Sequence, residues 1–382
     1  MPLLRHLFAS LAFISLIAGP LPVLAQDGAN VANNAPDRQL GTYESGRVLE
    51  VRLDTVTSTN ATTLKQLYQV ELRSGQSAGT HVTISSDVES NPYQLKPRTG
   101  DRVVVYVLPN EQGDLQYFLE GFDRRIPLLW LLVVFVLTLV ILAGWQGAKT
   151  AFSMFVSIGI IGFVLIPAFL KGANPVPIAL VLSGVFTLLS AGLSLGWDRK
   201  AFVTSIGTMG GVAVAYILSM IFSRWSHLSG LAMEEDRLFF AQNPMLNPEG
   251  LLFAGIIIAS MGVVEDVAVS IASGVEQIRL ANTRLSFKEM FHAGMVVGRD
   301  HMSALANTLI FAYVGASLST LLLYTQYGGS WLKFLNFDNV ADEVIRSLAG
   351  TIGLIFTVPI TALLAAWMAG RKSSKGGIRR NT

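Results

Sequence analysis

Seven stretches of about twenty predominantly apolar residues follow Arg124 and Arg125, and each is long enough to cross a bilayer as an α-helix. A backbone inside lipid has to satisfy its own hydrogen bonds, so these stretches are expected to be helical. The composition agrees, since 51% of residues are hydrophobic and only 14% are charged, against about 25% charged in soluble domains. We predict an α-helical polytopic membrane bundle in residues 125–370. Its seven predicted spans are 126–144, 151–170, 175–195, 202–222, 250–274, 303–323 and 348–369.

The first residues have the pattern of a signal peptide. Residues 1–25 combine a basic start at Arg5, an apolar core at 7–17 and a small residue, Ala25, at the expected cleavage position. An uncleaved anchor is the alternative, although the apolar core is short for a full span. Residues 26–45 are rich in Asn, Ala and Gly and are predicted to be a flexible linker.

Between the linker and the first span, the sequence changes to short runs in which apolar and polar residues alternate. Residues 46–124 contain five such runs, enriched in β-branched and aromatic residues and separated by turn sequences. Five strands in a segment of this size predict a small exported β-barrel, which we expect to be OB-like. The segment shows no nucleophile–base pair and no phosphate-binding loop. We therefore interpret it as a packing domain or a domain that binds a protein partner.

The distribution of basic residues predicts the orientation. If the β domain is outside, twelve Lys and Arg residues fall in the inside loops and the basic tail at 371–382, and five fall in the outside loops. This bias follows the positive-inside rule and agrees with an exported N-terminus. We predict that the N-terminal domain is outside and that the C-terminus is cytoplasmic.

Several kinds of chemistry are disfavoured. The absence of cysteine excludes disulfides and thiol catalysis, and the five histidines have no metal-ligand spacing. A net charge of +2 gives no reason to expect nucleic acid. We expect no metal, no cofactor and no enzymatic activity. The expected partners are the lipid bilayer, protons or small ions, a protein at the exported domain and a second copy of the chain.

The fifth span contains two adjacent carboxylates, Glu265 and Asp266, in a strongly apolar setting. On a helix of 3.6 residues per turn, Asp266 lies in a row of small and polar residues, whereas Glu265 lies in a more apolar row. No Lys, Arg or His lies deep in a predicted span, so Asp266 has no evident counter-charge and should readily take up a proton. We predict that the row faces other helices or a wet cavity. Its members are Gly255, Ala259, Gly262, Asp266, Ser270, Ser273 and Gln277.

The sixth span supplies candidate partners for Asp266. Asn307 and Thr308 lie about two helical turns beyond the cytoplasmic mouth, where Arg299 and Asp300 are adjacent. We predict a hydrogen bond from Asn307 or Thr308 to Asp266. A proton, ion or substrate path is then predicted to contain Asp266, Ser270, Ser273, Asn307 and Thr308.

Glycines at helical spacing are candidates for close helix packing, since small residues allow two backbones to approach. We assign this role to Gly207 and Gly211 in the fourth span, to Gly262 in the fifth and to Gly315 in the sixth.

The segments GVVEDVAVSIASGVEQI and GRDHMSALANTLIFAYVGAS resemble the YibE/F family of bacterial membrane proteins. The resemblance covers the membrane part and implies a permease of a bacterial cytoplasmic membrane. Glu265 departs from the family pattern and takes no role from it. A weaker similarity to SecDF and the resistance-nodulation-division permeases implies proton relay by a mid-membrane Asp. The matching motif positions are Gly262, Asp266, Ser270, Ser273, Gly298, Arg299, Asp300, Asn307, Thr308 and Gly315.

Two functions remain open at this point. The first is a proton-coupled permease or export accessory protein with Asp266 as the protonatable site. The alternative is a non-transporting scaffold or assembly factor whose exported domain binds a partner. An aspartyl intramembrane protease is disfavoured, because Asp300 lies too near the cytoplasmic mouth to face Asp266 at depth.

Overall fold

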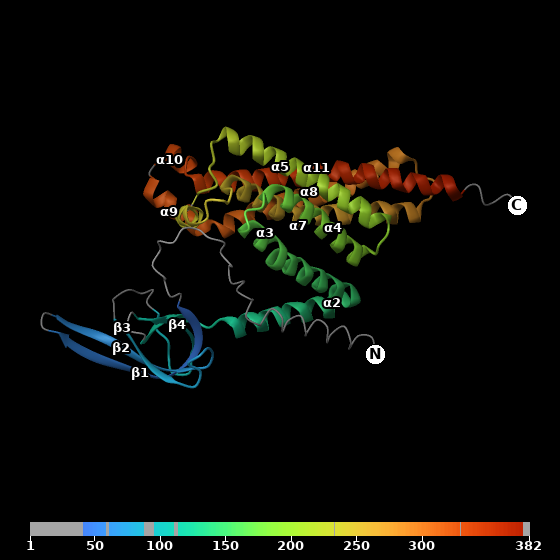
Figure 1. Ribbon diagram of the computed structural model, residues 1–382. Helices are drawn as coiled ribbons and strands as arrows, with labels where there is room; N and C mark the ends of the chain where they lie inside the picture. Colours follow the sequence, from blue (N-terminus) through green and yellow to red (C-terminus); the bar gives the residue numbers. More distant parts are fainter. Residues whose placement is uncertain are drawn as a thin grey trace. The chain divides into compact units, whose positions relative to one another are not determined.

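A computed structural model describes residues 41–58, 61–87, 95–110, 114–232, 234–328 and 330–376 (Figure 1). The predicted signal peptide, most of the predicted linker and the end of the basic tail lie outside these residues. The chain divides into two units, Met1–Thr138 and Leu139–Thr382, which are described in turn.

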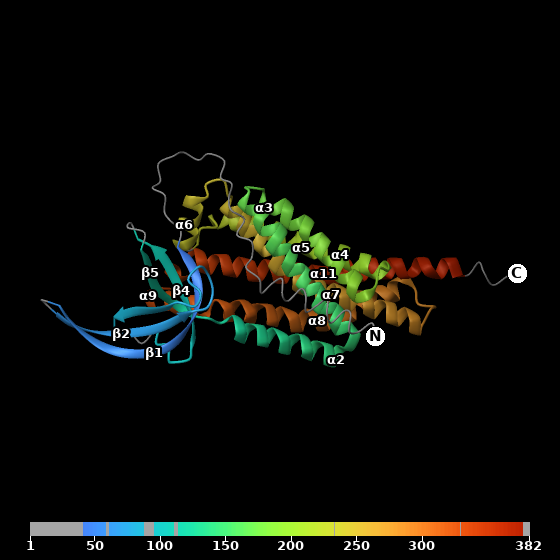
Figure 2. The same ribbon diagram turned by 60° about the horizontal axis from the view of Figure 1, so that its bottom comes forward.

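The first unit contains one antiparallel sheet of five strands in the order β3-β2-β1-β4-β5. The long strand β1 pairs along most of its length with β2 and through its first residues with β4. Strands β3 and β5 also contact one another, so the sheet curls on itself (Figure 2). The strands are β1 (Thr42–Ser58), β2 (Ala61–Leu72), β3 (His81–Asp87), β4 (Arg102–Pro109) and β5 (Leu115–Phe122).

The concave side of this sheet holds its apolar core. Alternate residues of β1, β2, β3 and β4 bury their side chains there, as the two-residue period of a strand requires. The core contains Val48, Tyr68, Val70, Leu72, Ile84, Val103, Val105 and Val107. Because β1 begins at Thr42, the strand starts inside the segment predicted as linker.

A turn after β2 packs tightly against the start of β1. The Ser74 hydroxyl accepts a hydrogen bond from the Ser45 backbone N–H at 2.7 Å, and the Ser45 carbonyl accepts one from Arg73 N–H at 2.7 Å. Gly75 follows with φ of +82°, and a Cβ added there would overlap the carboxyl group of Glu44. Glu44 is itself buried. The turn therefore requires glycine both for its left-handed backbone and for the space that Glu44 occupies.

Gly75→Ala should destabilise the β unit more than Gly79→Ala. Both glycines have a left-handed backbone, with φ of +82° and +86°, but a Cβ at Gly79 meets nothing within 4 Å. Each substitution has the cost of about 1 to 2 kcal/mol of a left-handed alanine, and overpacking against Glu44 adds about 1 to 2 kcal/mol at Gly75 alone. Hydrogen exchange of the β-unit amides in the full chain measures the difference. Equal hydrogen-exchange protection in Gly75→Ala and Gly79→Ala would contradict the close contact between Gly75 and Glu44.

The described residues that follow are mainly helical, and five of their helical segments are long and apolar enough to cross a membrane. These segments are Arg125–Leu170, Pro175–Leu195, Arg199–Trp225, Pro248–Ala281 and Asp338–Ala369. The helices are α2 (Arg125–Ile160), a π-helical turn (Ile161–Leu165), α3 (Ile166–Leu170), α4 (Pro175–Leu195), α5 (Arg199–Trp225), α6 (Glu234–Gln242), α7 (Pro248–Ala281), α8 (Phe287–Ala316), α9 (Leu318–Gly328), α10 (Trp331–Leu335) and α11 (Asp338–Gly376).

The difference from the seven predicted spans has two causes. The first two predicted spans belong to one helical segment, although Gly144, with φ of 57° and ψ of −135°, breaks the helical backbone between them. The sixth predicted span, 303–323, begins inside α8 and crosses the break between α8 and α9 at Ser317. The first half of α8 also carries charged residues, which shortens its apolar part.

Helices α4, α5, α7, α8 and α11 form one bundle (Figures 1 and 2). Helix α7 contacts each of the other four, and α11 contacts α5, α7 and α8. Valine, isoleucine, leucine and alanine side chains of α7 and α11 supply much of the core. The bundle thus places α7, with Glu265 and Asp266, at its centre.

Candidate functional site: the acid pair of helix α7

The start of α7 is fixed by local sequence. The Asn247 side chain accepts a hydrogen bond from the Gly250 backbone N–H at 3.1 Å, and Pro248 occupies the first helical position, where no N–H is needed. From there the helix runs without interruption to Ala281. Glu265 and Asp266 therefore lie on a regular helix, and their side chains point about 100° apart.

The two carboxylates have different surroundings. Glu265 is half-buried, and its side chain has Ser190 of α4 as a hydrogen-bond partner. Asp266 is exposed on the surface of the described chain, and the role predicted for it from the sequence stays a prediction. The residue that faces a neighbouring helix is Glu265.

The small and polar row through Asp266 lies largely outside the packed core. Ala259 and Gly262 are exposed, and a Cβ added at Gly262 meets nothing within 4 Å. Ser270 and Ser273, toward the other end of the row, are half-buried. The inward faces of α7 are instead made by alanine, valine and isoleucine, which allow close packing without an unpaired polar group. Other helices of the described chain therefore do not cover the middle part of this row, and the prediction that it faces other helices or a wet cavity stays a prediction.

Helices α7 and α8 run antiparallel, and their register places the predicted partners near the level of Asp266. The contacts that set the register join Gly274 with Val297 and Gly298 with Ile271. Continued along both helices, this register brings Asp266 level with Ala304 and within about one turn of Thr308.

The predicted hydrogen bond to Asp266 is not formed. The Thr308 hydroxyl donates to the Ala304 carbonyl at 3.0 Å, and Asn307 is exposed. Within the described part of the chain, neither side chain donates to Asp266. Both groups therefore lie on the outer surface, as Asp266 does.

The residues of the predicted cytoplasmic mouth are also exposed on the surface of the described chain. Arg299 and Asp300 are exposed, and neither forms an ion pair with another described residue. Glu276 of α7 forms an ion pair with Arg279 at 2.8 Å.

The four packing glycines divide into two pairs. A Cβ at Gly207 would overlap the Thr361 side chain, and one at Gly211 would overlap that of Thr357, so α5 and α11 approach closely at both positions. A Cβ at Gly262 or Gly315 meets nothing within 4 Å. Gly207 and Gly211 thus lie at a helix contact, whereas Gly262 and Gly315 lie on the surface of the described chain.

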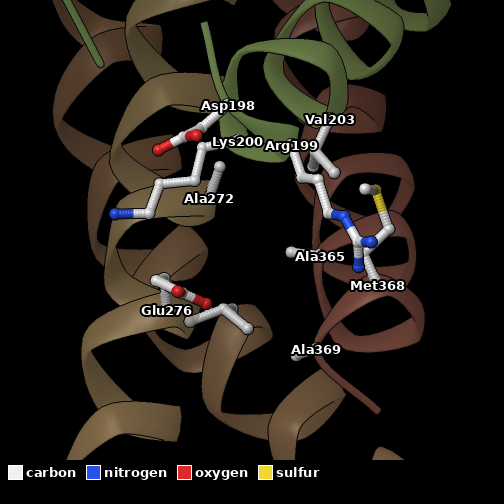
Figure 3. A pocket seen from close by; sticks show the side chains of 10 residues that line it. Asp198, Arg199, Lys200, Val203, Ala272, Glu276, Ala365, Met368 and Ala369 are labelled. Carbon is white, nitrogen blue, oxygen red and sulfur yellow. The ribbon is translucent and has the colours of Figure 1, made fainter. Parts of the chain in front are cut away.

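A cavity of about 230 Å³ opens on the same face of α7 as Glu265. Figure 3 shows Asp198, Arg199 and Lys200 at the start of α5, with Glu276 of α7 across the cavity from them. Glu276 belongs to the helical row of Glu265, about 16 Å further along the helix at 1.5 Å per residue. Neither Arg199 nor Lys200 is among the site residues predicted from the sequence. In the sequence, the helical row that Glu265 shares with Glu276 is the pattern that indicates this face of the helix.

Buried hydroxyl groups occupy the interior of the bundle near this face. Ser183 of α4, Thr204 and Thr208 of α5 and Thr361 of α11 are fully buried, and within the described residues their hydroxyl oxygens have no hydrogen-bond partner. Such groups usually find a partner in folded proteins. They give the interior of the bundle a polar character that its apolar composition does not suggest.

These features define a class, that of helical-bundle membrane proteins. The family model described as YibE/F-like protein matches residues 131–371, and the chain belongs to this family. Neither the curated proteins nor the solved structures contain a match to this chain.

Proposed function

We propose that this YibE/F-like protein is a proton-coupled permease or an accessory protein of export, and that the acid pair of α7 supplies its protonatable site. The observation that carries the proposal is the position of Glu265, a half-buried carboxyl at the contact of α7 with α4 that shares a helix face with the cavity at Glu276. A carboxyl in a low-dielectric setting with a hydroxyl partner can exchange a proton without leaving the bundle.

Polar groups on both sides of Glu265 support a path through the bundle. The buried hydroxyl groups of Ser183, Thr204 and Thr208 lie on α4 and α5, two of the four helices that pack against α7. Asp266, Ser270 and Ser273 remain candidates for a second, outer branch of the path on the surface between α7 and α8.

The proposal includes a seven-span topology, with the β unit outside a bacterial cytoplasmic membrane and the C-terminus inside. The break at Gly144 supports two spans within Arg125–Leu170, and the combined helical length of α8 and α9 supports a sixth span. The excess of basic residues in the loops that are then cytoplasmic supports the orientation. The strand order β3-β2-β1-β4-β5, with β3 against β5, supports an OB-like barrel.

One observation favours the alternative of a scaffold. Asp266, Asn307 and Thr308 are exposed together, and polar groups are costly when they face lipid. A helix of a partner protein or of a second copy would cover them. In that case the exposed row would serve assembly rather than transport.

Proteoliposomes that contain the full-length protein and a pH-sensitive dye distinguish these functions. Pools of amino acids, sugars, organic acids and inorganic ions are added to one side. A pool that changes the internal pH only in the presence of the protein supports a proton-coupled permease. A folded, correctly inserted protein that gives no pH change with any pool contradicts it and favours the scaffold.

A further inference from the structure

A second cavity, of about 420 Å³, lies between α6, the start of α7, the start of α9 and the start of α11. It is near the opposite end of α7 from the cavity at Glu276, because Pro248 and Leu251 form part of its wall. Its volume is in the range of cavities that hold small molecules, which is about 300 to 1,000 Å³. None of the residues predicted from the sequence to act in transport lines it.

Two charged side chains in its wall each have one buried atom without a hydrogen-bond partner among the described residues. Asp342 is only 8% exposed, and within the described residues its Oδ1 atom has no partner. Arg346 lies one turn later on α11, and its Nε–H is also buried without a described partner. A buried charged group without hydrogen bonds is strongly unfavourable. The cavity wall therefore contains one hydrogen-bond acceptor and one hydrogen-bond donor without described partners, and the two residues lie one helical turn apart.

The rest of the wall is largely apolar. Phe239, Phe240, Leu251, Leu252 and Val340 contribute to it. Glu343 and Asp236 add negative charge, which favours a cationic group beside Asp342.

A metal ion does not fit this arrangement, because the described residues include no group of three or more acidic or histidine side chains that could hold one. An organic ammonium group would pair with Asp342 but would leave Arg346 unmatched. A carboxylate alone would leave Asp342 unmatched.

We propose that this cavity binds an α-amino acid with an apolar side chain. The ammonium group donates to Oδ1 of Asp342, the carboxylate accepts from Nε–H of Arg346, and the side chain lies against Phe239 and Leu252. A zwitterion is the simplest ligand that satisfies both buried groups at once. This inference goes beyond the proposed function, because binding here does not require that Glu265 carries a proton.

Calorimetric titration of the full-length protein in nanodiscs tests the ligand class. The probes are L-leucine, isoamylamine, which lacks the carboxylate of leucine, and 4-methylpentanoate, which lacks its ammonium group. We expect leucine to bind and each half-ligand to bind at least about tenfold more weakly, the factor expected for the loss of one charge-assisted hydrogen bond. Failure of leucine to bind at millimolar concentration overturns the proposal, and so does a half-ligand that binds as tightly as leucine.

Variants locate the site. Asp342→Asn should weaken leucine binding at least about tenfold, with no loss of thermal stability, because the Oδ1 atom of Asp342 has no described hydrogen-bond partner to lose. Asp338→Asn is the matched control, since Asp338 is an exposed acid one turn earlier on α11 and should leave binding unchanged. The leucine affinity of Arg346→Gln provides a second, independent test if Asp342→Asn does not fold.

Unchanged affinity in both Asp342→Asn and Arg346→Gln overturns the proposal. Glu265→Gln should bind leucine normally, so a failure of amino-acid binding and a failure of proton coupling are distinguishable.

Discussion

Gly353→Leu should prevent stable packing of α11 against α5. A Cβ at Gly353 would lie 2.6 Å from the Gly211 carbonyl oxygen, 2.8 Å from the Ala215 Cβ and 3.3 Å from the Ala215 backbone nitrogen. None of these atoms belongs to the far end of a flexible side chain, so only separation of the two helices relieves the overlap. We expect a loss of more than about 3 kcal/mol in the free energy of unfolding, at the upper end of overpacking effects.

Gly262→Leu is the matched control for this substitution. Gly262 also lies within a membrane helix, but a Cβ there meets nothing within 4 Å. Leucine has the better helix propensity by about 1 kcal/mol, so this variant should be neutral or slightly more stable. Unfolding of both variants in mixed detergent micelles measures the difference. Wild-type stability of Gly353→Leu would contradict the close approach of α5 and α11.

Glu265→Gln should reduce solute-dependent proton movement in proteoliposomes to the background of empty liposomes. Glutamine keeps the size of the side chain and its hydrogen bond with Ser190, but it cannot release or take up a proton in this range of pH. Expression and thermal stability should be retained, because the substitution removes a carboxyl from a half-buried position.

Asp266→Asn is the control for Glu265→Gln, since Asp266 is the adjacent acid on the same helix and is exposed. We expect this variant to retain most of the proton movement. Loss of proton movement in Asp266→Asn, with retention in Glu265→Gln, would assign the role to the outer row instead. That outcome would restore the interpretation that the small and polar row of α7 suggests in the sequence.

The sequence was sufficient for the main divisions of the fold. Alternating runs predicted five strands, and the structure has five in a curled antiparallel sheet. Apolar length predicted membrane helices, and five segments of the structure qualify. The number of spans could not be settled in this way, because the break at Gly144 depends on one glycine backbone and the end of α8 on local packing around Ser317.

The orientation of α7 was not predictable from its sequence alone. Helical periodicity fixes the angle between Glu265 and Asp266, but it does not determine which side of the helix its neighbours cover. A row of small residues suggests close packing, yet the packed faces of α7 use Ala254, Ala268 and Ala272, beside valine and isoleucine. Long-range contacts with α4, α5 and α11 decide the rotation, and a single sequence does not contain them.

The cavity at Asp342 illustrates the same limit. Asp342 and Arg346 lie one turn apart near the start of α11, a spacing that usually describes a surface ion pair. Their burial arises from α6, α7 and α9, which are distant in sequence. Only the assembled bundle shows that these two charges share a wall.

The most direct test of the central claim is an infrared pH titration of the full-length protein in lipid, compared among wild type, Glu265→Gln and Asp266→Asn. If Glu265 is the protonatable site, a carboxylic-acid band should titrate in the wild type and in Asp266→Asn and should be absent from Glu265→Gln. Persistence of that band in Glu265→Gln, or its loss in Asp266→Asn alone, would contradict the assignment of Glu265 as the proton site.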